Sequence, residues 1–156
     1  MFLHNGGINK SMDFKKEIWD VLRSMKDSMD SIFRPIIEAH GLTVMQAHIL
    51  LAIKHYEHPT VGCLCGEIGL ASGNASAMCK KLERAGFLLR NRDPNDERFV
   101  TLTLTERGEA TMQKLGEAFE RKYGQIIESR SEAELKELIA GMKRFNAFIQ
   151  EMSMIK

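Results

Sequence analysis

The sequence predicts a mainly α-helical fold with one small β-hairpin, and three observations lead to this prediction. Apolar residues recur at helical spacing over most of the chain. The apolar period changes to two between about residues 87 and 104. A glycine or a helix-capping residue stands where most of the periodic segments begin or end. The length of 156 residues favours one compact domain, and a composition of 44% hydrophobic and 28% charged residues is typical of globular proteins.

A long first helix is predicted over Asp13–Ala39, ending at His40-Gly41, where glycine can adopt the left-handed conformation of a helix end. Pro35 lies inside this helix and predicts a kink. The spacing of six apolar residues alternates between four and three, as in the seam of a coiled coil: Ile18, Leu22, Met25, Met29, Ile32 and Ile36.

Three shorter helices follow. Thr43 with Gln46 forms a capping box for a helix that is apolar nearly all round, so we expect it to be buried, Leu51 included. Thr60 can cap a third helix that ends near Gly69. A fourth helix is expected to begin at a capping Ser72 and to run to about Ala85, stopping at Gly86. Two short helices joined by a glycine-containing turn match the helix-turn-helix pattern.

The next segments read as two strands, 87–91 and 100–104, around a turn at Asp93-Pro94. A hairpin directly after a helix-turn-helix makes a winged helix. Thr105 is predicted to cap a helix to about Glu128, and Ser131 with Glu134 to cap the last one. The last helix again shows three-four spacing, at Leu135, Leu138, Met142, Phe145, Ile149 and Met152.

These elements predict a winged helix-turn-helix with N- and C-terminal dimerisation helices. We expect residues 1–12 to be a flexible tail, 13–40 the N-terminal helix of a dimerisation region, 41–108 the winged helix-turn-helix, and 109–156 the C-terminal helices of the dimerisation region. If both apolar seams stayed uncovered in a monomer, they would form large exposed patches, so a homodimer is predicted.

Charge is concentrated in the middle of the chain. The net charge is only +1, yet residues 80–92 hold five cations against one acid, so the remainder is net acidic. A basic segment on an acidic body suits phosphate binding, although a solvated helix face has the same charge pattern.

The sequence excludes several function classes. No phosphate-binding loop, nucleophile elbow or zinc-protease motif occurs, so we expect neither an enzyme nor a cofactor. Three cysteines, Cys63, Cys65 and Cys79, without a signal sequence or an apolar membrane span indicate a cytoplasmic protein. Cys63 and Cys65 would lie on different faces of a helix, so no metal site is predicted. Cys79 is the best redox candidate because lysines follow it, unless it is simply buried.

Four segments carry a family resemblance. Leu42-Thr43-Val44-Met45-Gln46 resembles the L-T-x-x-Q motif of the MarR family of transcription regulators. Residues 81–88, 92–98 and 104–108 resemble that family's R-L-E-x-x-G-L-V motif, its wing with the D-x-R core, and its L-T-x-x-G motif. The resemblance implies a homodimer that binds double-stranded DNA, with recognition helices in successive major grooves and wings reaching the minor groove. It also implies that a small aromatic compound, an oxidant or a metal ion regulates binding.

The resemblance and the residues together predict a repressor with two sites. The expected DNA contacts are Ser72, Asn74, Ser76, Lys80, Lys81, Arg84, Arg92, Asp96 and Arg98. The expected effector pocket is lined by Trp19, Met25, Met45, His48, Leu115 and Phe119.

Each assignment has a simpler alternative. Asn74 suits a bidentate contact to adenine, and Arg98, held by Asp96, suits a narrow minor groove. Asp96 and Arg98 would also serve merely to brace the hairpin, and Ser72 to cap the helix. Ordinary core packing explains the pocket residues equally well.

One departure from the family leaves a second function open. Ala77 stands where the family's recognition helix often has an arginine. This favours a winged-helix protein-interaction module that has lost DNA binding. The cations retained on both the helix and the wing argue against that alternative.

Overall fold

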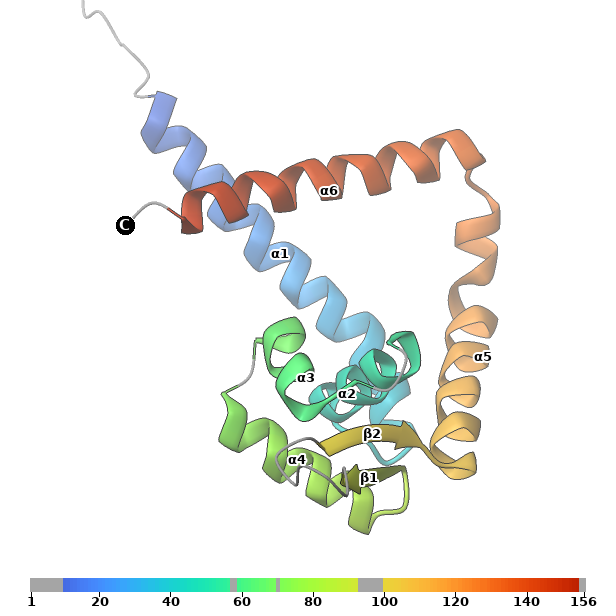
Figure 1. Ribbon diagram of the computed structural model, residues 1–156. Helices are drawn as coiled ribbons and strands as arrows, with labels where there is room; N and C mark the ends of the chain where they lie inside the picture. Colours follow the sequence, from blue (N-terminus) through green and yellow to red (C-terminus); the bar gives the residue numbers. More distant parts are fainter. Residues whose placement is uncertain (1–9, 57–58, 70, 93–99, 155–156) are drawn as a thin grey trace, which may run out of the picture. The chain divides into compact units, whose positions relative to one another are not determined.

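The computed structural model describes residues 10–56, 59–69, 71–92 and 100–154 (Figure 1). Within these residues the chain forms six helices and one hairpin, in the order α1 (Lys10–Ala39), α2 (Val44–His55), α3 (Val61–Ile68), α4 (Ser72–Arg84), β1 (Leu88–Arg92), β2 (Val100–Leu104), α5 (Glu106–Glu128) and α6 (Glu132–Ser153). The predicted mainly α-helical fold with a hairpin wing is therefore confirmed. The chain is divided into two compact units, Met1–Gly116 and Glu117–Lys156.

Local capping chemistry fixes most of the helix starts. Thr43 accepts a hydrogen bond from the backbone of Gln46, whose side chain accepts one from the backbone of Thr43, so the predicted capping box at the start of α2 is confirmed. The Thr60 hydroxyl accepts from the N–H of Cys63 (3.1 Å) at the start of α3. At the other end of the first helix, α1 continues through Pro35 to Ala39.

The start of α4 differs from the prediction. Ala71, with φ −60° and ψ 138°, occupies the N-cap position, and no side chain caps the helix. Ser72 is the first helical residue. Gly69, which ends α3, takes the left-handed conformation with φ 63°.

The hairpin is antiparallel and pairs Leu88 with Leu104 and Arg92 with Val100. An isolated β-bridge pairs Thr60, the residue before α3, with Thr101 of β2. β2 is thus fastened to the helix-turn-helix on one side and to β1 on the other.

Thr105 connects the hairpin to α5. Its hydroxyl donates to the carbonyl of Gly86 (2.7 Å) and accepts from the N–H of Gly108 (3.0 Å). A Cβ at Gly108 would overlap the carbonyl oxygen of Phe87, so only glycine allows this close approach. The L-T-x-x-G motif therefore has a structural explanation: threonine caps α5 and ties it to the end of α4, and glycine lets α5 approach the hairpin.

The core lies in the first unit. It is built from the inward faces of α2, α3, α4 and the hairpin, with Ile49, Leu50, Leu64, Leu82, Leu88 and Leu102 fully buried. One expectation for α2 was wrong, because Leu51 is 55% exposed instead of buried. His48, for which core packing was the simpler alternative, is exposed as well. The outer side of α2 therefore carries the apolar Leu51 uncovered in the single chain.

The second unit holds the end of α5 and all of α6. Ser131 caps α6, and its hydrogen bonds to Glu134 lower the pKa of that carboxyl. No residue of α6 is buried. Among the described helices, no single one is both long and apolar enough to cross a membrane. Taken together, α1 and α2 have the necessary length and composition, but the chain bends by 84° between them.

Candidate nucleic-acid interface

Helix α4 has one buried face and one exposed face. Ala75, Cys79 and Leu82 are buried in the core, and Met78 packs against it. The exposed side chains and glycines form the opposite face: Gly73, Asn74, Ala77, Lys80, Lys81 and Arg84. We call this set the α4 outer face. Because the inner face is anchored in the core, the outer face presents its polar groups on a rigid support.

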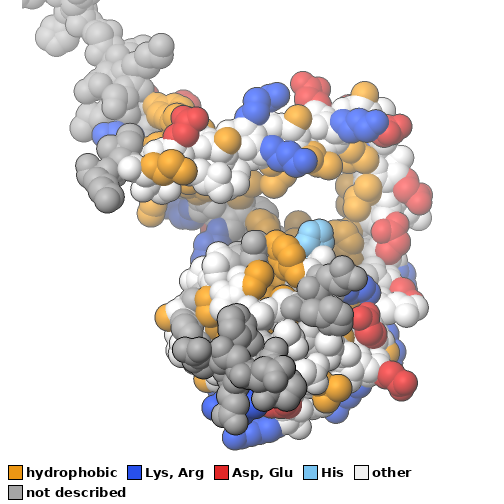
Figure 2. All heavy atoms as spheres, viewed as in Figure 1, with side chains coloured by type: hydrophobic (Ala, Val, Ile, Leu, Met, Phe, Trp, Pro, Cys, Tyr) orange, Lys and Arg blue, Asp and Glu red, His pale blue; other side chains and the backbone are white. Residues whose placement is uncertain are grey.

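Cations dominate the second half of the α4 outer face. Lys80, Lys81 and Arg84 are exposed, and the exposed Arg92 lies on the neighbouring strand β1. Within the described part of the chain, none of these four pairs with a carboxylate. Figure 2 shows blue side chains gathered at the lower edge of the winged body, where Figure 1 places α4 and the hairpin. Such a surface attracts polyanions through long-range electrostatics.

The structure brings five of the predicted DNA-contact residues together as exposed side chains: Asn74, Lys80, Lys81, Arg84 and Arg92. Ser76 is only half-exposed. Ser72 starts α4, as stated above. Asp96 and Arg98 lie outside the described residues, so their predicted contacts stay predictions.

Arg90 is one of the five cations that the sequence places between residues 80 and 92, but it was not among the predicted DNA contacts. This residue is on β1 between Leu89 and Asn91, but its side chain is only 12% exposed, and its Nη1 lies 3.9 Å from Oε2 of Glu83 on α4. Strand alternation offered the signal, because Arg90 shares a face with the fully buried Leu88.

The cysteines differ sharply in exposure. Cys63 is exposed, Cys65 is half-buried with its Sγ 3.1 Å from the carbonyl of Val61, and Cys79 is buried. Burial raises the pKa of the Cys79 thiol, and the nearby charge of Arg90 opposes this only in part. A buried thiol with a raised pKa is a poor nucleophile, so the structure favours a packing role for Cys79. No cluster of three or more metal-ligating side chains occurs among the described residues.

Apolar side chains also reach the surface on α1 and α6. On α1, Trp19, Val21 and Met29 are at least half-exposed, at 69%, 51% and 50%. On α6, Leu138, Ile139 and Met142 are 62%, 54% and 56% exposed. Exposed apolar residues in this number on two helices are typical of an interface with another chain.

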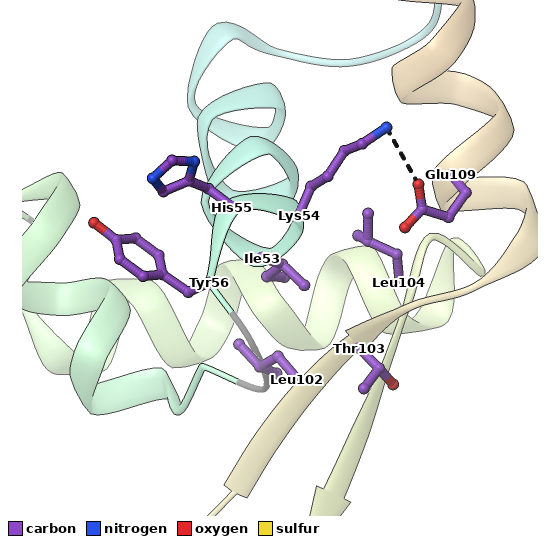
Figure 3. Close-up of a pocket in the computed structure, with 8 residues that line it drawn as sticks. All are labelled: Ile53, Lys54, His55, Tyr56, Leu102, Thr103, Leu104 and Glu109. Atoms are coloured by element: carbon purple, nitrogen blue, oxygen red, sulfur yellow. Dashed lines mark ion pairs between the residues drawn. The ribbon is translucent and has the colours of Figure 1, made fainter.

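Two of the cavities on the first unit lie beside α2. One, of about 510 Å³, is shown in Figure 3; polar and apolar side chains line it, and Lys54 and Glu109 in this lining form an ion pair of 3.4 Å. Its lining is Ile53, Lys54, His55, Tyr56, Leu102, Thr103, Leu104 and Glu109. The other, of about 350 Å³, lies on the outer side of α2 and is lined by His48, Leu51, Ala52, His55, Tyr56 and Ile68.

The predicted effector residues have different surroundings. His48 lines the second cavity, whereas Trp19 lines a hollow on α1 of about 240 Å³. Leu115 belongs to the core cluster, so ordinary packing accounts for it. Met25 and Met45 are half-buried in the first unit, and Phe119 is half-buried in the second.

Comparison with known proteins agrees with this geometry. A family model described as transcriptional regulator SarA/Rot matches residues 31–115, more than half of the chain. The HTH-type transcriptional regulator SarZ of Staphylococcus aureus is 28% identical over 109 residues, which cover 70% of this chain and 72% of that protein.

Solved structures show the same fold. Staphylococcus aureus MarR, in complex with salicylate and kanamycin, has a TM-score of 0.76 at 17% identity, covering 88% of this chain and 93% of that one. Streptococcus pneumoniae FabT, in complex with DNA, has a TM-score of 0.72 at 21% identity, covering 88% and 99%. The matched family consists of transcriptional regulators, which confirms the expectation that the chain is not an enzyme. The chain belongs to the SarA/Rot family of transcriptional regulators and has the winged-helix fold of MarR-type regulators.

Proposed function

We propose that this regulator acts as a homodimer that binds double-stranded DNA in a sequence-specific manner. The observation that carries the proposal is the α4 outer face, on which an exposed asparagine precedes three exposed cations. Recognition helices read base edges with their N-terminal residues, and later residues approach the phosphates. Asn74 is thus placed to read a base, and Lys80, Lys81 and Arg84 to bind the backbone.

The wing is proposed to extend the contact. Arg92 is the exposed last residue of β1, and Asp96 and Arg98 follow it in the sequence. A long cationic side chain in a narrow minor groove gains from the concentrated negative potential there. The FabT structure in complex with DNA supports the proposal, because a protein of the same fold binds DNA.

The homodimer is proposed from the exposed apolar residues of α1 and α6. A second copy would cover side chains such as Trp19, Leu138 and Met142, which are more than half-exposed in the single chain. A two-fold dimer presents two α4 helices. We therefore expect each dimer to bind two half-sites about 10 base pairs apart, which is one turn of the duplex.

Selection from random-sequence DNA tests this function. We expect the full-length protein, at low salt, to enrich a pseudo-palindromic sequence with that half-site spacing. A variant with Lys80→Met, Lys81→Met and Arg84→Met serves as the matched control and should enrich no sequence. If the wild-type protein also enriches none, the proposal is wrong, and a winged-helix module for protein interactions becomes the better interpretation.

Regulation by repression and by a small aromatic ligand is the finer part of this proposal. A dimer spanning two turns of promoter DNA would exclude other proteins from it. The cavity beside His48, of about 350 Å³, has the size of a small-ligand site and a mostly apolar lining. The complex of Staphylococcus aureus MarR with salicylate supports this choice of ligand class.

A ligand acts only by binding one state of the protein better than the other. The test is a thermal-shift screen with aromatic acids, repeated with His48→Ala, followed by a DNA titration of each hit. A compound that stabilises the protein and weakens DNA binding supports the proposal. A compound that stabilises the protein but leaves the DNA affinity unchanged contradicts it.

A further inference from the structure

Arg90 differs from every other cation around the α4 outer face. Lys80, Lys81, Arg84 and Arg92 are exposed, whereas the side chain of Arg90 is only 12% exposed. On β1 it shares its face with the core residue Leu88, and β1 packs against α4. Its guanidinium therefore lies between the strand and the helix instead of facing outward.

The guanidinium of Arg90 has charged neighbours, but not all of its N–H groups form hydrogen bonds. Its ion-pair partner on α4, Glu83, lies 3.9 Å from Nη1, which is too far for a hydrogen bond. Its Nε is buried and has no hydrogen-bond partner among the described residues. The positive charge of Arg90 also acts on the buried Cys79 of α4, where it opposes in part the rise that burial causes in the pKa of the thiol.

An ion pair of 3.9 Å between a mostly buried guanidinium and a carboxylate that is 38% exposed contributes little to stability, because water screens the exposed partner. A charged pair here is better explained by geometry. It links one residue of the wing hairpin to one residue of the recognition helix, and charge attraction favours one register between them. Both elements must contact the same DNA duplex, so their relative position determines whether the two contacts form together.

We propose that Arg90 is a positioning residue that holds the wing against α4 through Glu83, and that it is not itself a phosphate contact. This proposal rests on the proposed DNA binding. It assigns different roles to two arginines of the same strand: Arg90 fixes the wing, and Arg92 binds the backbone.

The salt dependence of DNA affinity distinguishes the two roles. The slope of log K against log salt is negative, and each phosphate contact that is lost reduces its magnitude by about 0.9; a dimer loses two contacts per substitution, about 1.8 in total. The assay is fluorescence anisotropy with the duplex recovered from the random-sequence selection. Arg92→Met, the matched control two residues along the strand, should reduce the magnitude of the slope by this amount. Arg90→Met should weaken binding about tenfold, within the range for coupled contacts, and leave the slope unchanged.

For the second variant, Glu83→Gln, the direction of the change in DNA affinity distinguishes the two possibilities. Removing an acidic group beside bound phosphates ordinarily strengthens DNA binding. If Glu83 holds Arg90, the substitution instead weakens binding, and Glu83→Gln combined with Arg90→Met is no weaker than Arg90→Met alone. This variant keeps the test decisive if Arg90→Met unfolds in a thermal melt.

Three results would overturn the positioning role: an unchanged affinity in Arg90→Met, a slope reduced as much as in Arg92→Met, or stronger binding by Glu83→Gln. If the wild-type protein fails to bind any selected duplex, the proposed function itself is wrong, and this inference is wrong with it. The two failures are thus distinguished by the behaviour of the wild type.

Discussion

Thr105 offers the sharpest test of how the winged unit is held together. Replacing it with valine keeps the shape of the side chain and removes the hydroxyl. The helix cap at Gly108 and the hydrogen bond to the carbonyl of Gly86 are then both lost. Loss of an N-cap costs about 1 kcal/mol, and loss of a typical hydrogen bond about 1 kcal/mol more, so the free energy of unfolding should fall by about 2 kcal/mol.

The assay is thermal unfolding followed by circular dichroism, with all variants at one protein concentration. For a chain of this size about 2 kcal/mol corresponds to a decrease in Tm of roughly 4–8 °C. Thr105→Ser is the matched control and should stay close to the wild type, because it retains the hydroxyl. Ser131→Ala removes a helix cap and an exposed hydrogen bond to the Glu134 carboxylate, which contributes little in water, so it should cost about half as much. If Thr105→Val has the same Tm as Thr105→Ser, the hydroxyl does not link α4, the hairpin and α5 as described.

Three other predictions follow from the fold. Gly108→Ala should destabilise the protein by about 1–3 kcal/mol, because a Cβ there overlaps a backbone carbonyl oxygen, whereas Gly116→Ala, in open space on the same helix, should stabilise it by up to about 1 kcal/mol; urea unfolding measures both, and equal signs would contradict the packing. Leu138→Glu, at a site 62% exposed in the single chain, should shift the sedimentation coefficient from dimer to monomer at micromolar concentration; a dimer that persists argues against α6 as the interface. Iodoacetamide at neutral pH should modify Cys63 promptly and Cys79 only after unfolding, because burial raises the pKa of the Cys79 thiol; mass spectrometry of the peptides shows whether this order is reversed.

The helix boundaries were largely predictable because they depend on local chemistry. Thr43 with Gln46, and Ser131 with Glu134, satisfy backbone N–H groups within one turn, so the sequence alone indicates where those helices begin. Ser72 was assigned wrongly by one position. A serine near a helix start is as compatible with the first helical residue as with the cap, and in the structure Ala71 has the extended backbone of the N-cap.

Exposure was harder to predict than secondary structure. Helix α2 is apolar nearly all round, so its sequence pattern has no polar side to mark Leu51 as exposed. Arg90 was counted with the surface cations, although strand alternation alone places it on the face of Leu88. Residues that we propose to face another chain or a ligand, such as Trp19 and His48, have sequence patterns that do not differ from those of core residues.

We propose that the α4 outer face binds DNA, and one salt titration tests this binding most directly. The duplex recovered by selection is titrated with wild-type protein and with the Lys80→Met, Lys81→Met, Arg84→Met variant at several salt concentrations. We expect the wild-type affinity to fall steeply with salt, and the magnitude of the slope to drop by about 0.9 for each phosphate contact removed, counted over both subunits. Equal affinities and equal slopes for the two proteins, with both folded, would contradict the claim that this face contacts the phosphate backbone.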